Sequence, residues 1–230
     1  MKITAIICTR DSKQVTSTTD KLLKFYVSCG IGVILMSGAK SLFAAYQGAF
    51  EKLNPSDDDV VIFCHDDIEI RENPQEFRNK LSEALDLPET GFIGPAGTSF
   101  LGENAVWWDQ DVWVAGKHHG KVTHINKNGA EYLTFYGNPG DVVVLDGLFL
   151  AAKGKTIREV GLSKPEDFQG EWDFYDIHYT SQAFFKGYTN KTISLDILHN
   201  SRGELVGRDS WHKNREAFIK KNKFPIKLED

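Results

Sequence analysis

Acidic and histidine side chains stand where apolar runs of this sequence end, and such side chains can bind a metal ion or accept a proton. The sharpest case is His65-Asp66-Asp67, which directly follows the apolar residues 60–64. Two adjacent carboxylates repel each other unless a cation joins them. Asp oxygens suit hard ions such as Mg²⁺ or Mn²⁺, which commonly bridge protein carboxylates to substrate phosphates. The alternative is a solvated turn in which Asp66 or Asp67 caps the next segment.

A second candidate is a carboxylate among aromatic side chains in residues 172–179. If residues 171–186 form a helix, Asp173 and Asp176 share one face of it. A carboxylate beside aromatic rings is partly desolvated, which raises its pKa and makes it a better general base. The alternative is that the acidic residues cap the start of the helix and the aromatic side chains belong to the core.

Two further polar positions interrupt or end apolar runs. His199 follows the strand-like residues 188–198, and its imidazole is either a metal ligand or a hydrogen-bonded structural group. Asp146 lies inside the apolar residues 142–152 and must meet a partner or face a cavity, because burying an unpaired charge is costly. The next residue, Gly147, allows a backbone or ligand to come close.

The segments that must position these side chains alternate between strand and helix patterns. We expect strands at 2–8, 31–36 and 60–64, and helices at 20–28, 42–53 and 74–85. This alternation predicts an α/β fold with a mostly parallel sheet, whose ligands bind beyond the carboxyl ends of the strands. Residues 101–138 lack a helical period and predict hairpins or long loops. A strand at 188–198 and a helix capped by Ser210 complete the chain.

Composition limits the class of protein. The 230 residues are 41% hydrophobic and 26% charged, which is ordinary for a globular chain, and no flexible linker divides them, so we expect one domain over 1–230. A net charge of −5 argues against nucleic acid as a partner. The 3 cysteines predict buried free thiols. No apolar run reaches the roughly 20 residues of a membrane span, and the first residues do not resemble a signal peptide, so the cytoplasm is the expected location.

Taken in order, these segments resemble GT-A fold glycosyltransferases of family 2, in particular a bacterial glycosyltransferase-like branch whose metal motif reads His-Asp-Asp. The segments that carry the resemblance are residues 6–11, 41–49, 61–68, 145–149, 173–188 and 199–201. It implies a Rossmann-like three-layer fold that binds a nucleotide-diphosphate sugar. The nucleotide-binding half would be about 1–100 and the acceptor half about 101–209, followed by a helix and basic tail at about 210–230.

The resemblance also implies a role for each matching residue. Asp67 and His199 would bind the metal, and Asp176 would be the catalytic base, with Tyr175 in place of the Glu that usually precedes it. The donor would contact residues at the strand ends and the mid-chain loop: Thr9, Arg10, Asp11, His65, Asp66, Asp146 and Gly147. His65 stands where the family commonly has an Asp.

The activity implied is a metal-dependent, inverting transfer of a sugar to a hydroxyl of a glycan or lipid-linked acceptor, in polysaccharide biosynthesis, with Mn²⁺ or Mg²⁺. The basic C-terminal residues either bring the protein to the inner face of the membrane or are a solvated helix face. Because His65 and Tyr175 depart from the motif, a non-catalytic nucleotide-sugar or glycan-binding domain is the alternative. A nucleotidyltransferase is a rival enzyme class, but the Gly-rich phosphate loop it needs is at best faint near residues 9–13.

Overall fold

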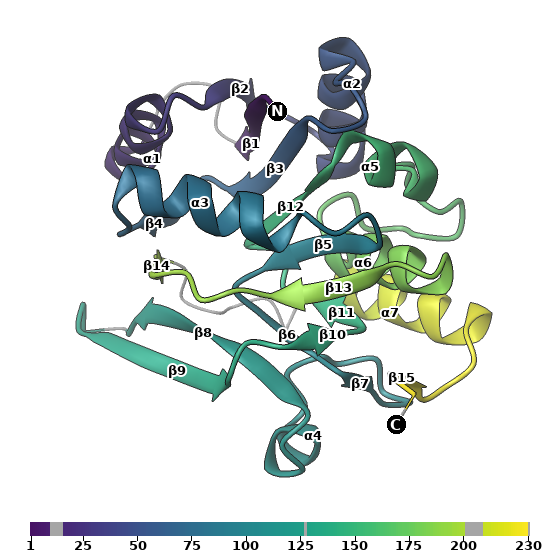
Figure 1. Ribbon diagram of the computed structural model, residues 1–230. Coiled ribbons are helices and arrows are strands. Elements are labelled where there is room, and N and C mark those ends of the chain that lie inside the picture. The colour runs from purple at the N-terminus through teal and green to yellow at the C-terminus, as the bar shows by residue number, and fades with distance from the viewer. Residues whose placement is uncertain (10–15, 127, 201–208, 230) are drawn as a thin grey trace.

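The computed structural model describes residues 1–9, 16–126, 128–200 and 209–229 (Figure 1). Within them the helices are α1 (Ser17–Ser28), α2 (Leu42–Leu53), α3 (Pro74–Ala84), α4 (Gln110–Val114), α5 (Gly154–Val160), α6 (Tyr175–Phe185) and α7 (Asp209–Lys221). The strands are β1 (Ile3–Thr9), β2 (Gly32–Ser37), β3 (Val60–His65), β4 (Ile68–Ile70), β5 (Thr90–Gly94), β6 (Ala96–Thr98), β7 (Phe100–Leu101), β8 (His118–Ile125), β9 (Glu131–Gly137), β10 (Asp141–Val142), β11 (Val144–Leu145), β12 (Phe149–Lys153), β13 (Thr189–Thr192), β14 (Ile197–His199) and β15 (Ile226–Lys227).

A 7-stranded sheet in the order β10-β13-β5-β12-β3-β1-β2 forms the centre of the molecule. Strands β2, β1, β3, β5 and β13 run in one direction, whereas β12 and β10 run in the other. Strands β1 and β3 are apolar along almost their whole length because both of their faces are covered. The prediction of an α/β fold with a mostly parallel sheet is confirmed.

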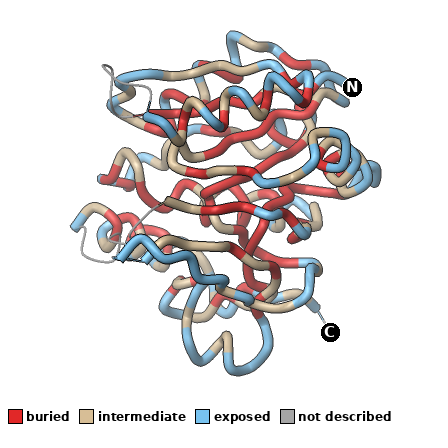
Figure 2. Tube along the Cα trace, turned by 90° about the vertical axis from the view of Figure 1, so that its left-hand side faces the viewer, coloured by how far each residue is buried: buried red, intermediate tan, exposed pale blue. Residues whose placement is uncertain are grey.

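Helices cover both faces of this sheet, which gives three layers (Figure 1). On one face Phe77 of α3 packs edge-on against Phe25 of α1, with ring centroids 5.2 Å apart. On the other face Tyr46 of α2 contacts Tyr175 of α6 at 5.9 Å. Figure 2 shows that the buried chain concentrates in the central strands, while the outer turns of the helices are exposed.

A second, 6-stranded sheet contains the path β11-β6-β8-β14-β4, with β9 paired to β8. The β8–β9 pair is the hairpin predicted in residues 101–138, but that prediction missed the short helix α4. Asp109 begins this helix by accepting hydrogen bonds from the backbone N–H groups of Asp111 and Val112. The sequence does not predict that β4, β8 and β14 meet in one sheet.

The prediction of a single strand at 188–198 is wrong, because this segment divides into β13 in the central sheet and β14 in the second sheet. Between them the chain leaves both sheets, and the backbone N–H of Asp196 donates to the carboxylate of Glu72 at 2.7 Å. Strand β14 then pairs antiparallel with β4, which places His199 opposite Ile68. This register decides where His199 lies.

The helix predicted at 171–186 begins later, at Tyr175, because Phe174 has a left-handed backbone with φ of 68° that a helix cannot include. Asp173 therefore does not share a helix face with Asp176, which corrects the prediction. The hydroxyl of Ser210 donates to the Asp173 carboxylate at 2.6 Å, and Ser210 lies within α7. None of the helices in the described ranges is long and apolar enough to cross a membrane.

Candidate active site

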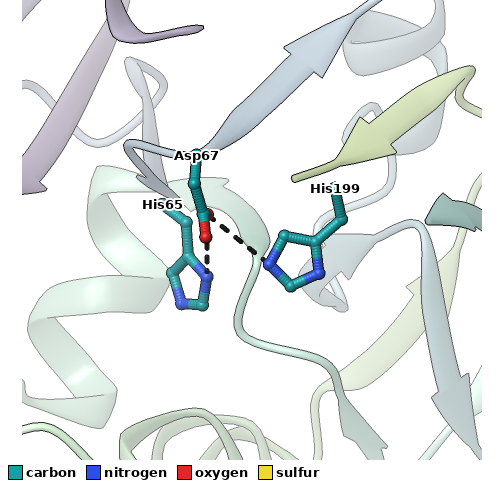
Figure 3. Close-up of side chains that lie close together, drawn as sticks. All are labelled: His65, Asp67 and His199. Carbon is teal, nitrogen blue, oxygen red and sulfur yellow. Dashed lines mark ion pairs between the residues drawn. The ribbon is translucent and has the colours of Figure 1, made fainter. Parts of the chain in front are cut away.

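His65 and Asp67 lie at the carboxyl end of β3, where the apolar strand turns toward β4. His65 is the last residue of the strand, and its Nδ1 lies 3.7 Å from Oδ1 of Asp67 (Figure 3). The turn is held from outside, because the Thr19 hydroxyl of α1 donates to the backbone carbonyl of Asp66 at 3.0 Å. The backbone that carries both side chains is therefore held in place at the end of β3.

His199 reaches the same place from the end of β14. The backbone N–H of Asn200 donates to the carbonyl of Asp67 at 2.8 Å, which ties the two strand ends together. Nε2 of His199 lies 3.5 Å from the same Oδ1 of Asp67, so the carboxylate stands between two imidazoles (Figure 3). Residues more than a hundred positions apart thus form one group.

The atoms of this group fit a divalent cation. One ligand atom each from His65, Asp67 and His199 lie within 4.8 Å of one another. Oδ1 of Asp67 and Nε2 of His199 are buried and have no hydrogen-bond partner among the described residues. Buried polar atoms normally have partners, and these two, which lie 3.5 Å apart, are placed to share a cation. One carboxylate and two imidazoles suit a transition ion such as Mn²⁺.

The charge state of the group also fits. Burial raises the pKa of Asp67, but the neighbouring His199 and His65 outweigh burial and bring the pKa to about 2. Burial lowers the pKa of His65, which favours the neutral ring that a metal needs. Burial lowers the pKa of His199 too, but Asp67 outweighs burial and raises it, so His199 would release a proton when it binds a cation. The group therefore offers an ionised carboxylate at neutral pH.

Asp176 lies at the start of α6, next to the loop that joins β11 to β12. The backbone N–H of Gly147 donates to Oδ2 of Asp176 at 3.0 Å. Burial, followed by the negative charge of Asp146, raises the pKa of Asp176 to about 7. A carboxyl group with such a pKa can accept a proton near neutral pH and release it again.

Tyr175 connects Asp176 to the histidine group. Its buried hydroxyl donates to the backbone carbonyl of Gly147 at 2.7 Å and lies 2.8 Å from Nε2 of His65. Gly147 is required for this approach, because a Cβ there would lie 2.4 Å from the Tyr175 hydroxyl and 2.8 Å from Cβ of Asp176. The end of β3 and the start of α6 are therefore joined through one glycine.

Of the other residues predicted to contact the donor, some lie near the ligand group and two lie outside the described residues. Thr9 ends β1, which pairs with β3 so that Cys8 lies opposite His65, and Thr9 is therefore near the group. Arg10 and Asp11 lie outside the described residues. Asp66 is next to the group without belonging to it. Asp146 lies beside the start of α6, and one of its oxygens accepts from the backbone N–H of Leu148 at 2.9 Å.

The structure adds two features to the predicted site. His65, expected among the donor contacts and within the His-Asp-Asp motif, belongs to the ligand group and has its Nδ1 directed toward Asp67. His124 of β8 packs against His199 with ring centroids 5.8 Å apart, and Tyr132 stacks on the other side of His124 at 5.4 Å. The contact between His124 and His199 has no local signal in the sequence, because it depends on the pairing of β8 with β14.

Comparison with known proteins gives three findings. The model of a glycosyltransferase-like family matches residues 4–221. The streptomycin biosynthesis protein StrF of Streptomyces griseus is 27% identical over 189 residues, which are 80% of this chain and 62% of StrF. The chain thus spans less than two thirds of that relative. The structure of GalNAc-T7 with UDP, GalNAc and Mn²⁺ superposes with a TM-score of 0.56 at 11% identity, covering 95% of this chain and 47% of that one.

Proposed function

Because this chain belongs to the glycosyltransferase-like family and has the GT-A fold, we propose that it is a metal-dependent, inverting glycosyltransferase. It would move a sugar from a nucleotide-diphosphate sugar to a hydroxyl of a glycan or lipid-linked acceptor. The observation that carries this proposal is the link through Gly147 between a three-residue ligand group and a carboxyl group with a pKa of about 7. A single displacement needs charge stabilisation and one base in close proximity.

His65, Asp67 and His199 are the proposed ligands. When bound, the cation supplies positive charge that offsets the charge developing on the leaving diphosphate. With two nitrogen donors and one oxygen donor, the group favours Mn²⁺ over Mg²⁺, which prefers oxygen ligands and retains its water. We therefore expect tighter binding of Mn²⁺ than of Mg²⁺.

Asp176 is the proposed base. It would take the proton of the acceptor hydroxyl while that oxygen forms a bond to the anomeric carbon. The bond from the anomeric carbon to the donor phosphate breaks at the same time, and its electron pair leaves with the diphosphate. Because attack and departure occur on opposite faces, the configuration inverts and no enzyme nucleophile is needed. The hydrogen bond from Gly147 holds one carboxylate oxygen in place beside the proposed acceptor site.

The donor would lie along the strand ends, in contact with the residues that the resemblance implies: Thr9, Arg10, Asp11, Asp66, Asp146 and Gly147. Donor and acceptor halves would belong to one domain. We also propose that the protein works in the cytoplasm, in polysaccharide biosynthesis. Contact with the inner face of a membrane is less favoured than solvation of α7, because Lys213 and Lys221 form ion pairs with Asp209 and Asp167.

A thermal-shift and turnover assay tests the proposed function. Uridine, guanosine and thymidine diphosphates are each added with Mn²⁺ or with EDTA, and hydrolysis of the matching sugar nucleotides is followed. We expect one nucleotide to stabilise the protein only with Mn²⁺ and its sugar nucleotide to be hydrolysed slowly. Stabilisation without turnover, even with acceptors present, would instead indicate a binding domain of the same fold. Equal stabilisation with EDTA would contradict the metal site.

A further inference from the structure

The Tyr175 hydroxyl has one proton and two neighbours that could receive it. The backbone carbonyl of Gly147 lies 2.7 Å away and Nε2 of His65 lies 2.8 Å away. A carbonyl oxygen can only accept a hydrogen bond, whereas a neutral imidazole nitrogen donates or accepts according to its tautomer. The position of this one proton therefore fixes the protonation pattern of His65.

The contact with Gly147 decides the direction. If the hydroxyl proton pointed to His65, two oxygen atoms would face each other at 2.7 Å with no proton between them, and a buried carbonyl would lose its partner. Leaving such a group unpaired costs roughly 1–3 kcal/mol. The hydroxyl therefore donates to Gly147, and Nε2 of His65 must carry a proton to donate to the hydroxyl. In the neutral ring, Nδ1 then holds a lone pair.

We propose that Tyr175 is a positioning residue that fixes His65 in the tautomer protonated at Nε2, so that Nδ1, the atom that faces Asp67, is free to bind the cation. The role in cation binding rests on the proposed function. Without Tyr175, a proton on Nδ1 could instead point to the Asp67 carboxylate and block the position that a metal would use.

The fold holds Tyr175 rigidly in this role. Its side chain is only 4% exposed and packs against Tyr46 of α2, with ring centroids 5.9 Å apart. The peptide groups on both sides of Gly147 are bonded to consecutive residues of α6, since Tyr175 donates to its carbonyl and Asp176 accepts from its N–H. The hydroxyl therefore has little freedom to turn away.

The two side chains are complementary in their hydrogen bonding. His65 and Tyr175 contact each other at 2.8 Å. An ionised glutamate at position 175 could accept from His65 but could not donate to Gly147. The histidine and the tyrosine thus form a matched pair, with a hydroxyl that satisfies both neighbours.

The first test measures the tautomer directly in metal-free protein labelled with ¹⁵N-histidine, at a pH at which His65 is neutral. The His65 signals are assigned by their loss in His65→Asn. We expect the wild-type protein to show the Nε2-protonated tautomer and Tyr175→Phe to show a mixture or the Nδ1-protonated form. A wild-type His65 protonated at Nδ1, or an unchanged tautomer in Tyr175→Phe, would overturn the proposal.

The second test measures Mn²⁺ affinity by calorimetry, with Tyr179→Phe as the matched control. Tyr179 lies one turn later on α6, is buried, and donates to the carbonyl of Leu162 at 2.8 Å, without a hydrogen bond to the site. We expect Tyr175→Phe to bind Mn²⁺ at least about 10-fold more weakly, as for other partners of metal ligands. Tyr179→Phe should bind it like wild type.

Equal affinity in wild type and Tyr175→Phe, or equal weakening in both variants, would contradict a positioning role. Failure of the wild-type protein to bind Mn²⁺ would instead overturn the proposed function. The tautomer measurement, which contains no metal, would then still decide whether Tyr175 fixes His65.

Discussion

The two sides of the site differ in how completely their polar atoms are paired. At the ends of β3 and β14, Oδ1 of Asp67 and Nε2 of His199 are buried, and no residue in the described part of the chain gives either a hydrogen bond. At the start of α6, the Tyr175 hydroxyl and the Asp176 carboxylate are both bonded to Gly147. The first side thus has buried polar atoms that the proposed cation would bind, whereas the proposed base is already held by a hydrogen bond.

This difference has an energetic consequence. Unpaired buried atoms cost free energy, so a cation that binds the folded protein and pairs them should stabilise it against unfolding. The start of α6 gains nothing comparable from a cation. Changes at the two sides should therefore separate metal binding from catalysis.

The largest expected effect is at the unpaired side. Asp67→Asn removes the only carboxylate of the ligand group, so we expect Mn²⁺ binding to be lost in calorimetry and transfer to fall about 10³-fold or more. Asp66→Asn is the matched control for binding, because Asp66 is adjacent yet outside the group. If Asp66→Asn abolished Mn²⁺ binding while Asp67→Asn retained it, the ligand assignment would be wrong.

At the paired side, Asp176→Asn should lower the rate of transfer by about 10²–10⁴-fold, because the base is lost, while leaving Mn²⁺ binding unchanged. In the wild-type protein the rate should rise with pH and level off above about 7, as Asp176 becomes deprotonated. Steady-state kinetics between pH 5 and 9 measure both. A rate in Asp176→Asn within a factor of a few of wild type would exclude Asp176 as the base.

Gly147→Ala should affect both sides together. A Cβ at this position would lie 2.4 Å from the Tyr175 hydroxyl, so the hydroxyl must move away from both Gly147 and His65. We expect a loss of stability of about 1–3 kcal/mol and a roughly 10-fold weaker binding of Mn²⁺. Gly48→Ala in α2, where a Cβ meets nothing within 4 Å, is the control and should not weaken binding. If Gly147→Ala lost stability but bound Mn²⁺ like the wild-type protein, Gly147 would not couple the two sides of the site.

The smallest expected effect is on stability. Burial and Asp146 raise the pKa of Asp176 to about 7, from about 4 in an unfolded chain. The folded state therefore binds the proton more tightly, and stability is lost as the pH rises from about 4 to 7. Asp176→Asn has no such loss, so at pH 8 its melting temperature should exceed that of wild type by a few degrees. Thermal melts at pH 4 should show no gain, and a gain that is independent of pH would refute the raised pKa.

The two sheets also differ in how far the sequence predicts them. The strands at residues 60–64 and 2–8 and the helix at 42–53 are local patterns of apolar residues, and the structure confirms each within a residue or two. They place His65, Asp66 and Asp67 at one sheet edge. Local patterns are sufficient here because each element buries a face that its own residues define.

The second sheet could not be predicted in this way. Its contacts join β4, β8 and β14, which are far apart in the chain, and the position of His199 depends on the register of β14 against β4. Helix α6 begins where it does because Phe174 has a left-handed backbone, a conformation that phenylalanine rarely adopts. The Tyr175–His65 contact joins this helix start to the end of β3, and no spacing along the sequence signals it.

The most direct measurement of the central claim is electron paramagnetic resonance of free Mn²⁺ titrated into the metal-free protein. Our account expects one ion to bind per chain in the wild-type protein and no bound ion in Asp67→Asn, with binding retained in Asp176→Asn. Equal binding in the wild type and Asp67→Asn, or no binding in the wild type, would show that His65, Asp67 and His199 do not form a metal site.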